Sequence, residues 1–193
     1  MSVEEIQNFF LRLFKKNVRI IDVHQVQTHY SLIDLFEKDI VNYDCSINNK
    51  TGEYIDNIII LFIPVVSEYF GHYQLIAKHN SKIYFFDSYG DDYVHLVEKV
   101  NKTKAVFISD NFGKLVINTN LEISINKYKY QTNASEDSTC GFHSSICGFF
   151  FLVSNEPNFT KYNDFISKYT NKNTSHSKYD SAVLYLFKNL QLK

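Results

Sequence analysis

Tryptophan is absent from this chain, and proline and glycine are scarce, with two and six copies among 193 residues. No internal repeat, low-complexity tract or linker-like stretch is found, so a repeat architecture or a long disordered segment is not expected. The chain is instead 45% hydrophobic and 16% aromatic, with 17 Phe and 14 Tyr. This composition is typical of a globular protein, and its length suits a single domain over residues 1–193 with a sizeable core.

A charge excess of one sign is also missing. The formal net charge is −1 at pH 7, so no global basic field is expected to attract nucleic acid. No apolar run approaches the ~20 residues that a membrane-spanning helix needs, so we expect no membrane partner. Residues 1–6 are acidic and then amphipathic, which is not the pattern of a secretory signal.

Cysteine is limited to three copies, Cys45, Cys140 and Cys147. An odd number in a chain of this size predicts free thiols and a reducing compartment. Cys147 lies among apolar residues and is predicted to be a buried, inert thiol. Cys140 lies at the boundary between a polar and an apolar stretch, which is a different setting.

Hydrophobic periodicity predicts an α+β fold: a central, mainly antiparallel sheet, a central helix with Cys140 at its amino end, and flanking helices at both chain ends. Apolar residues share one helical face over residues 3–16. The apolar run at 58–66 predicts a central strand buried on both faces, with Pro64 marking its end or a bulge. The other expected elements are helices at 31–40, 91–102, 163–169 and 179–190, strands at 104–109, 114–118 and 121–130, and a turn at 48–52.

The stretch 131–153 begins polar and ends in an apolar run long enough for a buried helix. Residues 137–139, Asp-Ser-Thr, are good N-cap residues, so the helix is predicted to begin at about Cys140. A thiol on the first turn faces unpaired backbone N–H groups and the positive end of the helix dipole, and both favour the thiolate. Gly141 follows, so no side chain is expected to block a substrate backbone. We therefore expect Cys140 to be a nucleophile, with a general base elsewhere.

Two strands are predicted at 72–79 and 82–87, joined by a two-residue turn at 80–81. This register places His72 and Asp87 on the same face of the sheet as diagonal neighbours, roughly 7–8 Å apart at the backbone. A hydrogen bond between them would fix the imidazole tautomer and leave the other ring nitrogen for a thiol. A three-residue turn would place the two side chains on opposite faces.

A zinc site is a competing hypothesis for the same helix. Cys140, His143 and Cys147 can share one helical face, and thiolates and imidazoles are zinc ligands. Such a site would need a fourth ligand and an unusual arrangement on one helix. The hypothesis of a cysteine nucleophile requires no metal and no cofactor.

The order of His72, Asp87, Gln131 and Cys140 along the chain resembles the cysteine proteases of the adenovirus maturation protease and ubiquitin-like-protein protease superfamily. The resemblance covers about residues 52–153 and fades on both sides. It is closer to the compact viral branch than to the cellular one, because no large insertion is present. The chain resembles a capsid maturation protease of a virophage or virus-like element. Such an origin also suits the heavy use of Asn, Lys, Ile, Tyr and Phe, which suggests an AT-rich genome.

Three local motifs carry this resemblance. Gly71-His72-Tyr73 is similar to the family's His-Trp at the start of the catalytic strand, with tyrosine in place of tryptophan. Residues 85–90, Phe-Phe-Asp-Ser-Tyr-Gly, resemble the strand end that carries the acidic residue. Residues 138–142, Ser-Thr-Cys-Gly-Phe, resemble the start of the nucleophile helix.

The resemblance implies that Cys140 is the nucleophile, that His72 is the general base and then the acid, and that Asp87 orients His72. Gln131 would donate its side-chain amide to an oxyanion hole alongside the Cys140 backbone N–H. Because Gln131 lies nine residues before Cys140, a longer spacing than is usual in the family, Asn133 is an alternative donor.

Tyr73 and Gly141 would border a narrow groove that favours glycine or other small residues beside the scissile bond. The implied substrate is a viral capsid or scaffold precursor, cleaved in the virion or the host cytoplasm. An isopeptidase for ubiquitin-like modifiers would use the same residues. An acyltransferase would use the same arrangement of histidine, acidic residue and cysteine. A non-enzymatic binding module, with or without zinc, is a further alternative. Some adenovirus-type relatives use DNA and a peptide as activators, but the near-neutral charge gives no support for a nucleic-acid activator.

Overall fold

The computed structural model describes residues 1–22, 30–31, 54–67, 70–90, 105–109, 114–118, 121–131, 139–170 and 178–191. The helices in these ranges are α1 (Val3–Phe14), α3 (Cys140–Val153), α4 (Phe159–Ser167) and α5 (Lys178–Gln191). The strands are β1 (Asn17–Asp22), β2 (Tyr30–Ser31), β3 (Tyr54–Ser67), β4 (Phe70–His79), β5 (Lys82–Asp87), β6 (Ala105–Ser109), β7 (Lys114–Asn118) and β8 (Glu122–Ile125). The predicted α+β class is therefore confirmed.

The main sheet has five strands in the order β1-β3-β4-β5-β8. The pairs β3–β4 and β4–β5 are antiparallel, whereas β1 pairs parallel with β3 and β8 pairs parallel with β5. The sheet is therefore mixed, and the expectation of a mainly antiparallel sheet holds for the three central strands only. Both edge strands are separated from their partners by long segments of chain, and parallel pairing requires such crossover connections.

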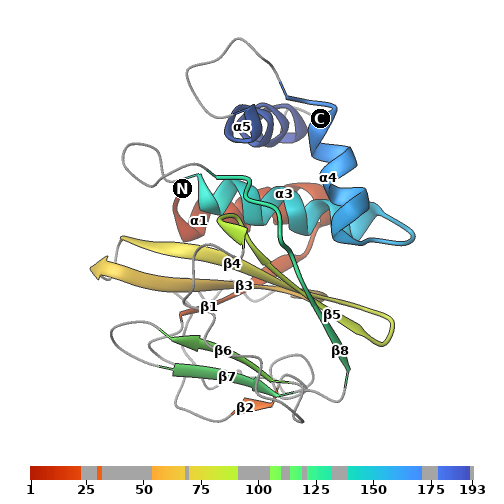
Figure 1. Ribbon diagram of the computed structural model, residues 1–193. Helices are drawn as coiled ribbons and strands as arrows, with labels where there is room; N and C mark the ends of the chain where they lie inside the picture. The colour runs from red at the N-terminus through yellow and green to blue at the C-terminus, as the bar shows by residue number, and fades with distance from the viewer. Residues whose placement is uncertain are drawn as a thin grey trace.

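A second sheet of three strands has the order β2-β7-β6. The strands expected at 104–109 and 114–118 are present as β6 and β7, which pair antiparallel with each other. They do not extend the main sheet, contrary to the expectation of one central sheet. Figure 1 shows them on the side of the main sheet that faces away from the helices.

The apolar run of β3 forms the middle of the main sheet. The side chains at residues 58–61 have no exposed surface, as expected for a strand covered on both faces. The pairing of β3 with β4 shifts register between Pro64 and Ser67, so the predicted irregularity at Pro64 is confirmed. Because β4 pairs with this buried strand, His72 of β4 lies in the middle of the main sheet.

The helix α3 lies across the main sheet, with α1 beside it and α4 and α5 on its outer side (Figure 1). Aromatic side chains join these helices: the ring of Phe9 in α1 stacks 4.5 Å from that of Phe187 in α5. Phe142 of α3 meets the same Phe187 ring edge-on at 4.9 Å. The close packing fixes the orientation of α3, and with it the position of Cys140.

The helices at the chain ends are confirmed, with altered bounds. α1 ends at Phe14, and Lys15 follows in the left-handed conformation with φ 59. α4 begins at Phe159, earlier than the predicted residue 163, because the Asn158 side chain caps it by accepting from the Lys161 N–H at 2.9 Å. α5 agrees with the predicted helix to within one residue at each end.

Several expected elements lie outside the described residues. These are the helix at 91–102, the turn at 48–52 and the helix at 31–40, except that Ser31 is the last residue of β2. The strand expected at 121–130 is confirmed for its first part only, as β8.

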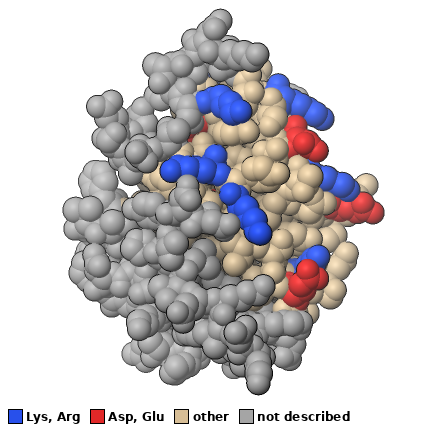
Figure 2. Space-filling view, in the orientation of Figure 1, with Lys and Arg blue, Asp and Glu red and all other residues tan. Residues whose placement is uncertain are grey.

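Within the described part of the chain, no helix is both long and apolar enough to cross a membrane. Basic and acidic side chains are both visible on the face drawn in Figure 2. Two exposed ion pairs, Lys82–Glu122 and Lys161–Glu156, each have an N–O distance of 2.9 Å.

Candidate active site

The β4–β5 hairpin brings His72 and Asp87 together. Asn80, in the turn, has the positive φ of 53 that a tight two-residue turn requires. Gln74 pairs with Asp87, as the predicted register demands. The His72 Nε2 lies 3.0 Å from Asp87 Oδ1. The predicted contact between these two side chains is therefore confirmed, whereas their catalytic roles stay a prediction.

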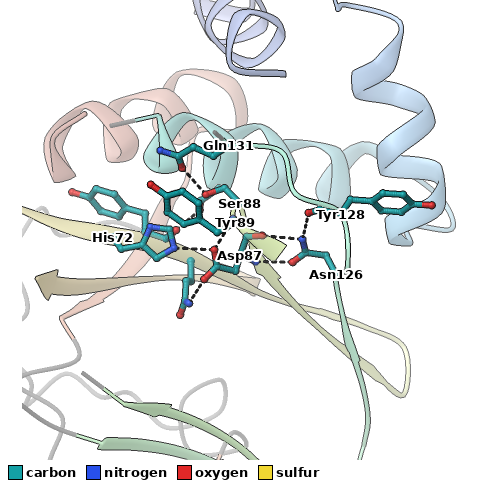
Figure 3. A network of polar contacts seen from close by, with 10 residues as sticks. His72, Asp87, Ser88, Tyr89, Asn126, Tyr128 and Gln131 are labelled. Atoms are coloured by element: carbon teal, nitrogen blue, oxygen red, sulfur yellow. Dashed lines mark hydrogen bonds and ion pairs between the residues drawn. The ribbon is translucent and has the colours of Figure 1, made fainter. Parts of the chain in front are cut away.

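Asp87 is the centre of a buried hydrogen-bond network (Figure 3). Besides His72, its carboxylate accepts from Gln74 Nε2 at 2.5 Å and from the Tyr89 N–H at 2.8 Å. The Asp87 backbone N–H donates to Asn126 Oδ1 at 2.7 Å, and Asn126 Nδ2 donates to the Asp87 carbonyl at 2.8 Å. Since Asp87 is only 1% exposed, these bonds fix the carboxylate in one position against His72.

The electrostatic environment keeps His72 protonated and Asp87 ionised. Burial by itself lowers the pKa of His72, but the charge and hydrogen bond of Asp87, together with those of Cys140, raise it from 6.5 to about 10. Burial likewise acts to raise the pKa of Asp87, yet its pKa is lowered, because the His72 charge and the network of donors outweigh burial. At neutral pH the pair is therefore an imidazolium and a carboxylate.

Cys140 is the first residue of α3, as predicted, and is 2% exposed. Its side chain is hydrogen-bonded to His72. The Nε2 of His72 is engaged by Asp87. An imidazolium beside a thiol at the start of a helix favours the thiolate, which is the nucleophilic form.

The predicted N-cap differs in one respect. Thr139 precedes the helix as expected, but its side chain makes no capping hydrogen bond to α3. Instead, Thr139 Oγ1 donates to Asp180 Oδ1 of α5 at 2.5 Å. The other two expected N-cap residues, at 137 and 138, lie outside the described residues.

Gly141 and Tyr73, expected beside the substrate, are both packed against other side chains. A Cβ on Gly141 would lie 3.0 Å from Met1 Sδ and 3.2 Å from Tyr73 Cδ2. Burial raises the pKa of Tyr73, and the charges of Cys140 and Glu5 add to this effect. Met1 and Tyr73 therefore occupy the space beside Gly141, and the roles expected of Gly141 and Tyr73 beside a substrate stay predictions.

Gln131 is 1% exposed and is held by Ser88. Its Oε1 accepts from Ser88 Oγ at 2.7 Å, and its backbone N–H donates to the Ser88 carbonyl at 2.9 Å (Figure 3). The Nε2 of Gln131 is buried and has no hydrogen-bond partner among the described residues. A fixed, unsatisfied amide donor is the group that an oxyanion hole requires. The alternative donor, Asn133, lies outside the described residues.

The zinc hypothesis gains no support from the structure. His143 points its Nε2 at Asp180 Oδ1, 2.9 Å away. Cys147 is fully buried, and burial raises its pKa well above the ordinary value. Over the described ranges, no group of three or more His, Cys, Asp or Glu side chains is placed to hold a metal ion.

Three partners of the site were not predicted from the sequence. The contact of Gln74 with Asp87 can be predicted from the hairpin register, because Gln74 is the residue directly opposite Asp87. Asn126 lies 39 residues from Asp87 and Asp180 lies 41 residues from Thr139, and neither carries a local motif.

Comparison with known proteins gives no match: no family model, curated protein or solved structure is significantly similar to the chain. The geometry and chemistry of the residues therefore carry the functional proposal.

Proposed function

We propose that the protein is a cysteine endopeptidase with Cys140 as nucleophile, His72 as general base and acid, and Asp87 as the residue that orients His72. One observation carries this proposal: a buried imidazole lies with its Nε2 3.0 Å from Asp87 Oδ1, and the Cys140 side chain at the start of α3 is close enough to raise the pKa of the same ring. This is the arrangement of nucleophile, base and orienting group that covalent catalysis needs.

In the first half of the reaction, the Cys140 thiolate attacks the carbonyl carbon of the scissile peptide bond. The carbonyl π electrons move to oxygen, which becomes the oxyanion of a tetrahedral intermediate. When the C–N bond breaks, the imidazolium of His72 gives its proton to the leaving amine, and a thioester to Cys140 remains. The raised pKa of His72, about 10, ensures that this proton is present at neutral pH.

In the second half, the now neutral His72 takes a proton from a water molecule as that water attacks the thioester carbon. Collapse of the second tetrahedral intermediate breaks the C–S bond, which releases the carboxylic acid and restores the thiolate–imidazolium pair. Asp87 keeps its negative charge throughout, since its pKa is lowered by His72 and its other donors.

The proposed hydrogen-bond donors to the oxyanion are the Gln131 side-chain amide and the Cys140 backbone N–H. The support is the buried Nε2 of Gln131, which has no partner among the described residues while Ser88 fixes the other side of the amide. Each such donor is worth ~3 kcal/mol of transition-state stabilisation by comparison with oxyanion-hole deletions elsewhere.

The substrate class follows from the resemblance to adenovirus-type maturation proteases. We propose capsid or scaffold precursors of a virophage or virus-like element as substrates, with small residues such as glycine beside the scissile bond. The proposed sites of action are the virion and the host cytoplasm, where cysteines remain reduced.

The test is digestion of a proteome-derived peptide library by the purified protein, with new termini identified by mass spectrometry. We expect new termini with wild-type protein and none with Cys140→Ala, which removes only the sulfur from a buried position. Cys147→Ala is the matched control on the same helix and should retain cleavage. Retained cleavage in Cys140→Ala would eliminate Cys140 as the nucleophile.

Isopeptidase activity uses the same residues and needs a separate assay. A panel of ubiquitin-like modifiers carrying C-terminal electrophiles is incubated with wild type and with Cys140→Ala. Endopeptidase function predicts no adduct. A covalent adduct at Cys140 with one modifier would indicate that the substrate is a modifier conjugate and not a capsid precursor.

A further inference from the structure

The side chain of Ser88, the residue that follows Asp87 at the end of β5, holds the side-chain amide of Gln131. Ser88 Oγ donates to Gln131 Oε1 at 2.7 Å, and both side chains are buried. Since the oxygen and the nitrogen of an amide lie on opposite sides of its carbon, a donor at Oε1 places Nε2 on the side away from Ser88. Figure 3 shows this arrangement, with the Gln131 amide nitrogen turned away from Ser88.

The backbone around Ser88 is held without the help of its side chain. The Ser88 carbonyl accepts from the Tyr130 N–H at 2.8 Å and from the Gln131 N–H at 2.9 Å. The residue before it, Asp87, is bound through both of its backbone groups by the Asn126 side chain, at 2.7 and 2.8 Å. Removal of the Ser88 hydroxyl therefore leaves these backbone bonds in place and takes away the bond to the Gln131 amide.

The direction of the amide matters for the proposed oxyanion hole. A glutamine side chain has several rotatable bonds, and its amide carries a donor on one side and an acceptor on the other. Only Nε2 can donate to an oxyanion, whereas Oε1 in the same place would repel it. The donors of an oxyanion hole act because they are already in position when the negative charge develops.

We propose that Ser88 is a positioning residue for Gln131, and that its hydroxyl holds the amide with Nε2 presented to the substrate carbonyl oxygen. This inference rests on the proposed function of Cys140 and Gln131. It gives two adjacent residues at the end of β5 two different tasks: Asp87 orients His72, and Ser88 orients the oxyanion donor. Ser88 should therefore affect only those reactions of Cys140 that pass through an oxyanion.

Two reactions of Cys140 separate this role from general damage to the site. In acylation by the phenyl ester of N-acetylglycine, the thiolate attacks the ester carbonyl carbon, and the carbonyl oxygen becomes an oxyanion. The C–O bond then breaks, phenolate leaves, and a thioester to Cys140 remains. In alkylation by iodoacetamide, the thiolate displaces iodide from a saturated carbon, and no oxyanion forms. Both second-order rate constants are measured at neutral pH, with the modified residue identified by peptide mass.

We expect Ser88→Ala to lower the rate constant for acylation about fivefold, which corresponds to ~1 kcal/mol, the ordinary net contribution of one hydrogen bond. Alkylation should stay within about twofold of wild type. Gln131→Ala should lower the rate constant for acylation about a hundredfold. In the Gln131→Ala background, Ser88→Ala should cost no more than a further factor of about two, because the hydroxyl has no amide left to hold.

The matched control is Ser145→Ala, which removes the hydroxyl of another buried serine. Ser145 lies on α3, and its Oγ has no hydrogen-bond partner among the described residues. Both rate constants should therefore stay within about twofold of wild type in Ser145→Ala. If Ser88→Ala does not fold, Ser88→Gly, which lacks the same hydroxyl, takes its place.

Three results would overturn the inference: acylation of Ser88→Ala within about twofold of wild type, equal losses in acylation and alkylation, or a full fivefold loss in the Gln131→Ala background as well. A wild type that is acylated no faster than Gln131→Ala would remove Gln131 from the proposed oxyanion hole, and the inference would fail with it. A rapidly acylated wild type, a slow Gln131→Ala and an unaffected Ser88→Ala would remove only the role of Ser88.

Discussion

The substitution Asp87→Asn provides a quantitative test of the electrostatics at His72. The pKa of His72 is raised from 6.5 to about 10 against the opposing effect of burial. That difference corresponds to ~5 kcal/mol in favour of the imidazolium. Asparagine keeps the size of the side chain but removes the charge, so burial, the largest single effect, is opposed only by the smaller effects of Cys140, and the pKa of His72 is expected to fall to 6.5 or below.

The sign of the stability change follows from the same pKa values. Because the pKa of His72 is higher in the folded state than in the unfolded state, protonation of His72 stabilises the fold. This stabilisation is fully present below pH 6.5 and is lost as the pH rises through about 10. The free energy of unfolding of wild type should therefore decrease over this window relative to His72→Gln. In Asp87→Asn the decrease should be absent.

The measurement combines an NMR titration of the histidine ring protons with urea unfolding at several pH values. His72→Gln assigns the His72 resonance, and His79→Gln, at the far end of β4, is the control that should leave it unchanged. A wild-type His72 that titrates at or below 6.5 would refute the reasoning. An unchanged His72 pKa in Asp87→Asn would refute it as well.

Three further predictions concern the surroundings of the site. Gln131→Ala should lower kcat for peptide cleavage about 10²–10³-fold while alkylation of Cys140 is unchanged; equal losses in both assays would argue against an oxyanion role. Gly90→Ala should reduce the free energy of unfolding in urea by ~1–3 kcal/mol, because Gly90 has φ +67 and a Cβ would lie 2.9 Å from the Tyr128 carbonyl oxygen; an unchanged midpoint would contradict this. Cys147, whose pKa is raised by burial, should remain unlabelled in the native protein at about pH 8, and labelling as fast as that of Cys140 would show that it is accessible.

The His72–Asp87 contact could be predicted because it depends on local sequence alone. A two-residue turn fixes which residues of the two strands share a face, and the turn at 80–81 was readable from its residue types. The start of α3 at Cys140 was equally local, since it follows from the change of a polar stretch into an apolar one.

The parts that could not be predicted depend on partners distant in the sequence. The parallel edges β1 and β8, and the separate sheet of β2, β6 and β7, are decided by which strand docks against which, and periodicity does not encode that choice. Thr139 shows the same limit at a single residue: its type predicts a cap, but a carboxylate of α5 binds the hydroxyl instead. The start of α4 is different, because asparagine is a strong N-cap residue and the position of Asn158 is sufficient to predict a helix that begins at Phe159.

The most direct test of the central claim is the pH dependence of thiol alkylation in native wild type and in His72→Ala. Iodoacetamide is suitable because it is small and Cys140 is only 2% exposed. The account predicts selective modification of Cys140 well below about pH 8 in wild type, and loss of that reactivity in His72→Ala. Slow labelling of Cys140 that increases only near the ordinary thiol pKa of about 8.5, with no effect of His72→Ala, would contradict an activated Cys140–His72 pair.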